Sequence, residues 1–294
     1  MIIKKILNRS YKYRLFINKM HSRYSLEKMK DKVNKKYICI FNKDINWDNP
    51  QTYNEKINVA KLLFNTDLKT KCTDKYEVRE IVKERIGEQY LIPLINVYKS
   101  FDEINFEDLP SKFVMKMNND SGSVYICKDK NNLNYKKIKK RFDYYLKRNF
   151  AYELFELHYV NIKPLILIEP LIEESIRDYK FLCFDGIPYY CRVDFDRFGN
   201  HTRNIYDLKW NLQDFNKGKY SNCEQEIKKP EKFDEMKKLV QKLCVGFDQV
   251  RVDMYDVNGK IYFGEMTFTN GAGMEKFYPD EKDIEIGNLW NLRK

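Results

Sequence analysis

Two carboxylates near the carboxyl end of the chain stand in segments whose pattern is typical of paired strands. Asp253 follows Arg251-Val252, Glu265 lies within Tyr262–Thr267, and the turn signal Asn258-Gly259 separates the two segments. Paired carboxylates can hold Mg²⁺, which takes one or two of them together with phosphate oxygens. The alternative is a salt bridge between Arg251 and Glu265 on an exposed sheet face.

The length of the turn decides between convergent and divergent carboxylates. A two-residue Asn258-Gly259 loop would point Asp253 and Glu265 to opposite faces. A three-residue loop, Val257-Asn258-Gly259, with Gly259 left-handed, would place Glu265 opposite Arg251 and Asp253 diagonally beside it, at a Cβ separation of ~7–8 Å or less. We expect the three-residue loop.

A lysine followed by a small polar loop stands earlier in the chain. Lys116 ends an apolar segment, and the next residues run Asn118-Asn119-Asp120-Ser121-Gly122-Ser123. Its ammonium and the loop N–H groups could surround phosphate oxygens. The alternative is an ordinary surface hairpin, which explains most such loops.

The apolar segment Ile166–Ile172 breaks at Glu169-Pro170. Such a break leaves backbone N–H and C=O groups unpaired beside apolar walls, as an adenine ring requires. The alternative is a strand end that Pro170 turns aside.

The surrounding pattern predicts a mixed α+β chain with mainly antiparallel sheet. Thr52 and Glu55 form a capping-box signal for a helix over 53–64, and a second helix is expected from Thr73 to Ile86. Residues 26–47 form a polar connector. Helices are also expected over 135–148 and 230–244, and strands over 90–98, 112–117, 124–128, 164–169, 179–184, 188–195, 249–257 and 260–267.

Composition restricts the class of protein. The 294 residues are 43% hydrophobic and 33% charged, which is globular, and no run reaches the ~20 apolar residues of a membrane span. Seven cysteines without a CxxC pair, and three scattered histidines, exclude the usual zinc-ligand spacing. The expected location is the reducing cytoplasm, with peripheral contact at the inner face of the cell membrane as a further hypothesis.

The net charge of +11 is uneven. Residues 1–25 contain seven Lys or Arg and no acid, with apolar residues interleaved. This pattern fits a helix on an anionic membrane surface, or a solvated helix packed on the body of the protein. No nucleic-acid-binding module is recognisable, and we expect no nucleic-acid partner.

Several segments in one order resemble the TupA-like ATP-grasp proteins of bacterial polysaccharide and teichuronopeptide gene clusters. The likeness runs from about Asn49 to Gly273. It is carried by Asn49-Pro50, Asn54-Glu55-Lys56, Asp74-Lys75, Val78-Arg79, Leu109-Pro110, Phe113-Val114-Met115-Lys116, Ser121-Gly122, Asp178-Tyr179-Lys180-Phe181, Asp185-Gly186, Arg251-Val252-Asp253 and Gly264-Glu265-Met266-Thr267-Phe268-Thr269.

The resemblance implies an ATP-grasp fold, in which two α+β lobes grip a nucleotide between them, with a basic helical region in front. The implied division is 1–48 (basic N-terminal helical region and connector), 49–110 (region preceding the ATP-grasp lobes), 111–172 (small lobe) and 173–294 (large lobe with the metal site).

The resemblance also implies roles for single residues. Those expected to bind ATP are Lys75, Lys116, Ser121, Gly122, Ser123, Glu169, Ile172, Asp178 and Lys180. Within this set the two lysines would contact phosphates, Glu169 and Ile172 would border adenine, and Asp178 is a candidate for the ribose.

Arg251 and Lys116 would be the catalytic cations, with Arg251 on the transferred phosphoryl group. Asp253 and Glu265 would bind Mg²⁺. Many ATP-grasp enzymes place an asparagine two residues after the glutamate as third ligand, but here that position is Thr267, and Asn270 is a substitute a few residues on.

The implied function is ATP- and Mg²⁺-dependent ligation of a carboxylate to an amine through an acyl phosphate, in capsule-type surface polysaccharide biosynthesis. The expected partners are an anionic glycan or lipid-linked saccharide and an amino acid or amine, with membrane contact through residues 1–25. Three alternatives stay open: an ATP-grasp kinase acting on a sugar or lipid hydroxyl, a glycosyltransferase, and a non-catalytic scaffold.

Overall fold

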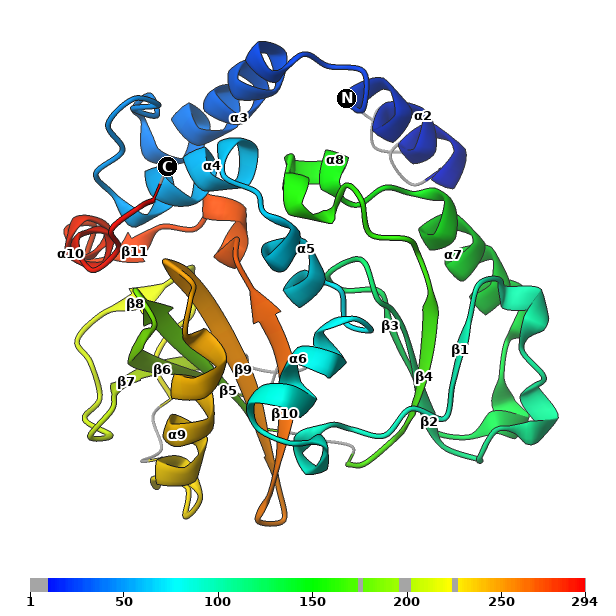
Figure 1. Cartoon of the computed structure of the whole chain (residues 1–294). Helices are drawn as coiled ribbons and strands as arrows, with labels where there is room; N and C mark the ends of the chain where they lie inside the picture. Colours follow the sequence, from blue (N-terminus) through cyan, green and yellow to red (C-terminus); the bar gives the residue numbers. More distant parts are fainter. Residues whose placement is uncertain (1–9, 174–176, 196–201, 224–226, 294) are drawn as a thin grey trace. The chain divides into compact units, whose positions relative to one another are not determined.

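The computed structural model describes residues 10–173, 177–195, 202–223 and 227–293, which form two compact units (Figure 1). Unit 1 comprises the described residues of Met1–Val33, Thr66–Glu77 and Ile92–Ile172. Unit 2 comprises those of Asn34–Asn65, Val78–Leu91 and Glu173–Lys294. Each unit therefore combines stretches that are distant in the sequence, and the four consecutive segments expected from the sequence stay a prediction.

Unit 1 is built on a four-stranded antiparallel sheet with the order β1-β4-β2-β3. Its strands are β1 (Asn96–Tyr98), β2 (Phe113–Met117), β3 (Val124–Cys127) and β4 (Ile166–Pro170). Its helices are α2 (Tyr11–His21), α5 (Asp67–Thr73), α7 (Tyr135–Lys147) and α8 (Ala151–Leu154), with short 3₁₀ turns at 101–103, 106–108, 130–132 and 157–159, and α3 (Leu26–Phe41) continues into unit 2.

One side of α2 packs on α7 and α8. The rings of Tyr11 and Tyr144 stack with centroids 4.5 Å apart, and the Asn18 amide exchanges two hydrogen bonds with the backbone of Asn149. The packed-helix alternative is confirmed for α2, although its Lys12 and Lys19 are exposed, and residues 1–9 lie outside the described residues. Within the described part of the chain, no helix is long and apolar enough to cross a membrane.

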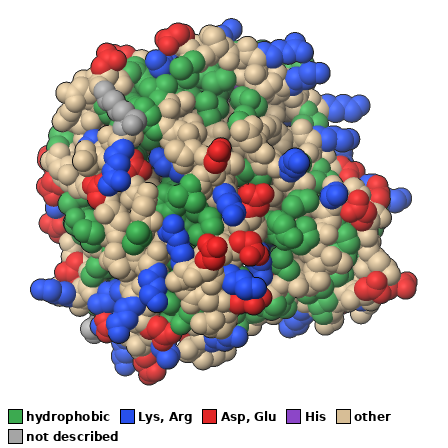
Figure 2. Space-filling model, in the orientation of Figure 1, with side chains coloured by type: hydrophobic (Ala, Val, Ile, Leu, Met, Phe, Trp, Pro, Cys, Tyr) green, Lys and Arg blue, Asp and Glu red, His purple; other side chains and the backbone are tan. Residues whose placement is uncertain are grey.

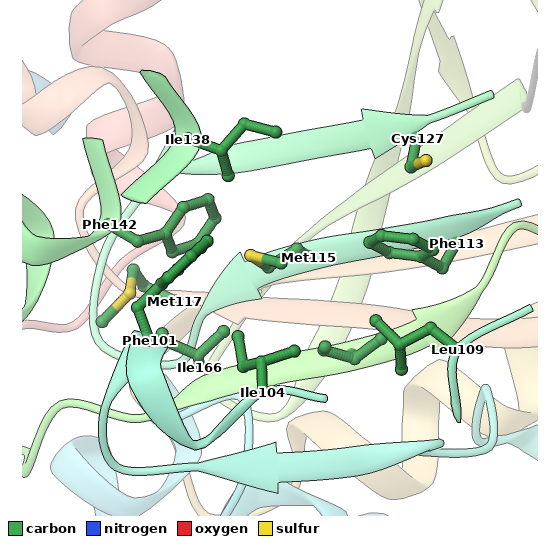
Figure 3. Close-up of a cluster of buried hydrophobic side chains, with 11 residues drawn as sticks. Phe101, Ile104, Leu109, Phe113, Met115, Met117, Cys127, Ile138, Phe142 and Ile166 are labelled. Carbon is green, nitrogen blue, oxygen red and sulfur yellow. The ribbon is translucent and has the colours of Figure 1, made fainter. Parts of the chain in front are cut away.

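The core of unit 1 follows from strand alternation. Met115 and Met117 of β2 point to the same face as Ile166 of β4, where Phe142 of α7 covers them (Figure 3). Lys116, between the two methionines, therefore faces the other side of the sheet. Because alternate residues of a strand point to opposite faces, the candidate phosphate-binding Lys116 points away from this core.

Two helix predictions are wrong. The polar connector expected over 26–47 contains α3, whose buried Met29, Val33 and Tyr37 are spaced four residues apart, as in one helical stripe. The helix expected from Thr73 to Ile86 begins only at Val78, as α6 (Val78–Arg85), and α5 ends at Thr73. The Asp74 carboxylate accepts hydrogen bonds from the backbone N–H groups of Tyr76 and Glu77, which holds the residues between the two helices in a turn. The strand expected over 90–98 shortens to β1, and the other predicted strands lie within two residues of their observed bounds.

Unit 2 contains a five-stranded antiparallel sheet with the order β10-β9-β5-β6-β7. The strands are β5 (Arg177–Phe184), β6 (Ile187–Phe195), β7 (Thr202–Asp207), β9 (Gln249–Val257) and β10 (Lys260–Thr267). One face carries Phe181, Val252 and Met254, and α9 (Phe233–Cys244) covers it. The other face carries ionised side chains from all five strands, and these form the candidate site.

The remaining elements of unit 2 pack beside this sheet. The predicted capping box of α4 (Tyr53–Leu63) is confirmed, because the Thr52 hydroxyl accepts from Glu55 N–H and the Glu55 carboxylate accepts from Thr52 N–H. Tyr53 enters a core with Phe184, Phe277 and Trp290. The other elements are α10 (Lys282–Asn288), the paired strands β8 (Asn216–Lys217) and β11 (Phe277–Tyr278), and 3₁₀ turns at 88–90 and 270–273.

Candidate active site

The hairpin that carries the two carboxylates has a two-residue turn. Val257 pairs with Lys260, and Asn258 and Gly259 between them both have positive φ, 53° and 76°. This geometry matches the right-handed twist of the flanking strands, and the three-residue loop predicted from the sequence is therefore wrong. A regular ladder beyond this turn would separate the carboxylates onto opposite faces.

A bulge at Gly264 restores their convergence. Phe263 pairs with Met254, and the next pair is Glu265 with Asp253, so one extra residue enters β10 and the register shifts by one. A Cβ atom at position 264 would lie 2.9 Å from the Tyr255 ring and 3.1 Å from the Asp253 carbonyl oxygen, which leaves room only for glycine. Glu265 thus stands directly opposite Asp253, and Arg251 opposite Thr267, instead of the predicted Glu265–Arg251 pair.

Arg251 joins both carboxylates. Its Nε donates to Asp253 Oδ1 at 2.6 Å, and its Nη2 donates to Asp253 Oδ2 and Glu265 Oε1, each at 2.7 Å. The predicted salt bridge between Arg251 and Glu265 is thus present. It does not lie on an exposed sheet face, because Arg251 is only 7% exposed and Asp253 only 1%.

Two further side chains complete this cluster. Lys180 of β5 donates to Asp253 Oδ2 at 2.7 Å and also pairs with Asp178, while Thr267 donates to Glu265 Oε1 at 3.0 Å. Burial alone would raise the pKa of Asp253, but Arg251 and Lys180 outweigh it and lower that pKa to about 2. Burial likewise opposes the charge of Arg251, yet Asp253 and Glu265 raise its pKa above the ordinary value.

The donor set suits Mg²⁺ in chemistry, although it is small. Among the described residues there is no group of three or more His, Cys, Asp or Glu side chains that could hold a metal ion. A magnesium site that uses nucleotide phosphates needs only one or two carboxylates, and Asp253 and Glu265 supply two on one face. The third ligand stays a prediction, since Thr267 binds Glu265 and the side-chain oxygen of Asn270 accepts from Arg251.

A second set of buried cations lies on the same sheet face and was missed from the sequence. Arg192 of β6 pairs with Lys180 in the ladder, and Arg203 of β7 stands opposite Asp194. Asp194 accepts from Arg203 Nε at 2.6 Å and lies 3.4 Å from Arg192, so its pKa is held far below the ordinary value despite burial. The available signal was charge at alternating positions of otherwise apolar strands, as in Cys191-Arg192-Val193-Asp194.

This second set contains hydrogen-bond donors that could bind a ligand. In the described part of the chain, Arg192 Nε and Asn270 Nδ2 are buried without a hydrogen-bond partner. Lys217 is 1% exposed and lies over the rings of Tyr53 and Phe277, and its ammonium donates to the Asn270 carbonyl at 3.3 Å. Burial lowers the pKa of Arg192 to about 10 and that of Lys217 to about 8. Buried donors and cations in this state favour an anion as ligand.

In unit 1, the predicted phosphate loop is anchored at its base. The Asn118 side chain binds Asp74, Lys163 and Leu165, and the Lys75 N–H donates to the Asn118 carbonyl at 3.1 Å. These bonds fix the loop from below while its tip, Ser121 and Gly122, stays exposed.

Asp120 anchors the far side of the loop. It accepts from Ser123 and Arg148 through its carboxylate and from the Lys75 ammonium through its carbonyl. Arg148 is held in turn by Glu153 and by the ring of Tyr145. Ser123 is buried, so only part of the predicted loop can offer its backbone N–H groups to a ligand.

Lys116 and Glu169 meet on the open face of the unit 1 sheet, with Nζ 2.7 Å from Oε2. Diagonal places on β2 and β4 bring them together, because Lys116 pairs with Leu167 and Glu169 with Val114. Ile172 follows the end of β4 and is half-buried. The assignment of phosphate contact to Lys116 and of adenine contact to Glu169 and Ile172 stays a prediction.

The predicted site residues therefore form two groups. Unit 1 holds Lys75, Lys116, Ser121, Gly122, Ser123, Glu169 and Ile172, and unit 2 holds Asp178, Lys180, Arg251, Asp253, Glu265 and Thr267. In unit 2 the bonds described above join all six members into one network. In unit 1, Lys116 contacts Glu169 directly, while Lys75 and Ser123 both bind Asp120.

A family model for TupA-like ATPgrasp proteins matches residues 55–291. The chain belongs to this family. The ATP-grasp fold class expected from the sequence is thereby confirmed. No curated protein matches the chain.

Solved structures of ATP-grasp ligases are similar to the chain. D-alanine–D-alanine ligase from Bacillus anthracis, complexed with ATP, is 17% identical, with a TM-score of 0.39 over 67% of this chain and 54% of that one. L-amino acid ligase from Bacillus licheniformis is 13% identical, with a TM-score of 0.47 over 85% and 56%. The ligase PsnB, complexed with a minimal precursor, Mg and ADP, is 12% identical, with a TM-score of 0.37 over 69% and 52%. The chain spans about half the length of each of these proteins.

Proposed function

We propose that this TupA-like ATP-grasp protein is an ATP-dependent carboxylate–amine ligase that acts in bacterial surface polysaccharide biosynthesis. The observation that carries the proposal is the ionised sheet face of unit 2. There Asp253 and Glu265 face each other at one end, and Arg192 and Lys217 offer buried donors to an anion nearby. A ligase of this kind needs both a metal-binding carboxylate pair and cations for an acidic substrate.

In unit 1, Lys75, Lys116 and the tip of the Ser121–Ser123 loop would bind phosphates, and Glu169 and Ile172 would border adenine. In unit 2, Asp178 and Lys180 would bind nucleotide, and Asp253 and Glu265 would bind Mg²⁺. When bound, Mg²⁺ neutralises phosphate charge and polarises the phosphoryl oxygens.

The reaction has two balanced steps. An oxygen of the acid substrate attacks the γ-phosphorus of ATP, the bond to the bridging oxygen breaks, and ADP leaves. The amine then attacks the carbonyl carbon of the acyl phosphate, inorganic phosphate leaves with the bonding electron pair, and the nitrogen loses a proton as the amide forms. Arg251, whose guanidinium is fixed by both carboxylates, stabilises the charge on the transferring phosphoryl group.

The acid substrate would place its anionic group at Arg192, Arg203 and Lys217. A uronic-acid-type glycan, free or lipid-linked, has the required carboxylate, and an amino acid or other amine is the second substrate. The unpartnered Arg192 Nε and Asn270 Nδ2 would then gain acceptors, which removes the cost of leaving buried donors unpaired.

The test is product analysis with the full chain, Mg-ATP, a panel of uronic-acid glycans and a panel of amino acids. A ligase releases ADP and inorganic phosphate in equal amounts and forms an amide. Hydroxylamine added in place of the amine should trap the acyl phosphate as a hydroxamate, which identifies the acid substrate independently of the natural amine.

Two outcomes would overturn the proposal. Release of ADP with a stable phosphoester and no inorganic phosphate would assign the site to a kinase that acts on a hydroxyl group. Binding of nucleotide-sugars without binding of ATP would assign it to glycosyl transfer.

A further inference from the structure

A concentration of positive charge lies on unit 1, outside the candidate active site. Residues 10–25 and 135–148 together contain eleven Lys or Arg and one acid, Asp143. The first segment contains α2 and the second contains α7. Thirty residues therefore have a net charge of +10, whereas the whole chain of 294 residues has a net charge of +11.

The two helices lie side by side and form one surface. Tyr11 of α2 stacks on Tyr144 of α7, and the Arg14 guanidinium lies over the same tyrosine ring at 5.0 Å. A groove of about 370 Å³ runs between the helices. It is lined by Tyr11, Lys12, Leu15, Tyr135, Lys136, Lys139, Lys140, Asp143, Tyr144 and Lys147. We call these lining residues, together with Phe16 and Lys19, the α2–α7 surface.

Part of the charge on these helices is used within the protein. Arg14 and Arg148 pair with Glu153, and Lys139 pairs with Asp102 and Asp143. Five exposed lysines of the α2–α7 surface make no ion pair with any described residue: Lys12, Lys19, Lys136, Lys140 and Lys147. In Figure 2, lysine and arginine side chains project at the upper right, on the side where Figure 1 draws α2 and α7.

Exposed apolar side chains stand among these lysines. Phe16 is 63% exposed and Tyr135 is 45% exposed. Lys12, Phe16 and Lys19 follow each other at spacings of four and three residues, so they share the outer side of α2. A soluble polyanion needs the lysines only, whereas a membrane surface uses both the lysines and the exposed aromatic side chains.

We propose that the α2–α7 surface binds an anionic lipid bilayer, with lipid phosphates on the lysines and Phe16 between the headgroups. Each lysine near such a surface strengthens binding about fivefold, and Phe16 adds the burial of an exposed ring. The sequence indicated membrane contact only for residues 1–25, and the structure extends the surface to α7, which supplies most of its charge. This inference goes beyond the proposed ligase function and does not depend on it.

The experiment measures co-sedimentation of the full chain with vesicles. Neutral phosphatidylcholine vesicles are compared with vesicles that contain about 30% phosphatidylglycerol, at low salt and at about 0.5 M salt. The variant with Lys136→Glu, Lys140→Glu and Lys147→Glu reverses three charges of α7. Its partition onto anionic vesicles should fall by about 100-fold or more, and high salt should have a similar effect on the unmodified chain.

A matched control reverses three exposed lysines of unit 2, by Lys228→Glu, Lys238→Glu and Lys242→Glu. It changes the net charge by the same amount and should retain most of the binding. Phe16→Ser, which leaves every charge in place, should lower partition by about tenfold at both salt concentrations. If the α7 variant does not fold, Phe16→Ser and the salt series on the unmodified chain still decide the matter.

Three outcomes would overturn the proposal: equal binding to neutral vesicles, an equal loss in the unit 2 control, or binding that salt and Phe16→Ser leave unchanged. Tighter binding to a soluble anionic polysaccharide or RNA than to the vesicles, lost in the α7 variant, would assign the surface to that polyanion instead of a membrane.

Discussion

In unit 1 the candidate phosphate loop is held by main-chain bonds at its base and by a buried ion pair at its far side, whereas in unit 2 the candidate metal site is a network of ionised side chains on one sheet face. The loop depends on the Asn118 amide, on carbonyls that accept from Lys75 and Asn118, and on the pair between Asp120 and Arg148. The sheet face depends on Arg251 and Lys180, which bind the buried Asp253 and the half-buried Glu265.

This difference predicts how the stability of each unit responds when one charged side chain is removed. In unit 1, Lys116 pairs with one carboxylate, so its loss leaves Glu169 without its cation. In unit 2, Arg251 joins two carboxylates, so its loss leaves two neighbouring negative charges that repel each other and are poorly solvated. The predictions below test whether the two units differ in this way.

Glu265→Gln should have the largest effect, and it acts on turnover. Glutamine keeps an oxygen that can accept from Arg251 and Thr267, so the hairpin should stay folded, but one metal-binding charge is lost. We expect ligase turnover to fall by at least about 10³-fold, together with the Mg²⁺ dependence of ATP affinity. ADP release and calorimetric titration with ATP at varied Mg²⁺ measure the two effects.

Asp256→Asn on the same hairpin is the matched control. Asp256 accepts from Gly259 N–H near the turn, and asparagine keeps that oxygen. The control should turn over normally. Full activity in Glu265→Gln would show that Glu265 does not bind the metal.

Arg251→Met should have the next largest effect, on stability. It leaves Asp253 and Glu265 as neighbouring carboxylates without their shared cation, at a cost of about 3 kcal/mol in the free energy of unfolding. The equivalent change in unit 1, Lys116→Met, should cost less, about 2 kcal/mol, because it leaves one carboxylate, that of Glu169, without its cation instead of two.

Urea unfolding with and without Mg²⁺ checks this contrast. Mg²⁺ should restore part of the stability of Arg251→Met, since a divalent cation can replace the guanidinium between the carboxylates, and it should do little for Lys116→Met. Equal losses in the two variants, or no gain from Mg²⁺, would contradict the distinction between the units.

Gly264→Ala tests the geometry of the carboxylate pair, because it keeps both carboxylates but disturbs the bulge that aligns them. The added Cβ meets the Tyr255 ring and the Asp253 carbonyl, so the bulge must distort. We expect a loss of about 2 kcal/mol in stability and weaker Mg²⁺-dependent ATP binding, although both carboxylates remain.

Gly259→Asn is the control for Gly264→Ala, because asparagine tolerates the positive φ of that turn and nothing lies near its Cβ. It should leave Mg²⁺-dependent ATP binding intact. Unchanged metal dependence in Gly264→Ala would mean that the bulge does not align the acids.

The same hairpin shows how far a sequence can predict a site. The identities of Asp253 and Glu265, and the capping box of Thr52 and Glu55, follow from local patterns, and the structure has both the paired strands and the cap. The register does not follow from local patterns. It depends on Tyr255 packing against Gly264 across the ladder, which the turn residues alone do not reveal.

The buried cations were beyond sequence reasoning for a related reason. Arg192, Arg203 and Lys217 stand on three strands, and only the sheet order places them beside Asp194 and Asn270. In α3 the buried side chains are too few among lysines for composition to reveal the helix, although their spacing of four residues does.

Lys217→Met should have a smaller effect of opposite sign, because it stabilises the fold. Burial lowers the pKa of Lys217 from 10.5 to about 8, with Glu275 and Asp283 opposing the shift and Arg192 and Arg203 adding to it. Below pH 8 both states hold the proton, and the folded state carries the cost of a buried charge. Methionine removes that cost, and we expect a gain of about 1–2 kcal/mol at pH 7, reduced by the lost contact with Tyr53 and Phe277.

The pH dependence of stability tests whether the buried charge of Lys217 is the cause of this gain. Between pH 8 and the ordinary lysine pKa, the unfolded state of the unmodified chain binds the proton more strongly than the folded state, so stability rises with pH. From about pH 8 to 9.5, below the pKa of about 10 of Arg192, the unmodified chain should gain about 1.5 kcal/mol relative to Lys217→Met. A constant difference across this range would mean that Lys217 carries no such cost. If Lys217→Met is more stable and still binds Mg-ATP, but no longer binds the acid substrate, then unit 2 retains this buried cation for its ligand and not for its fold.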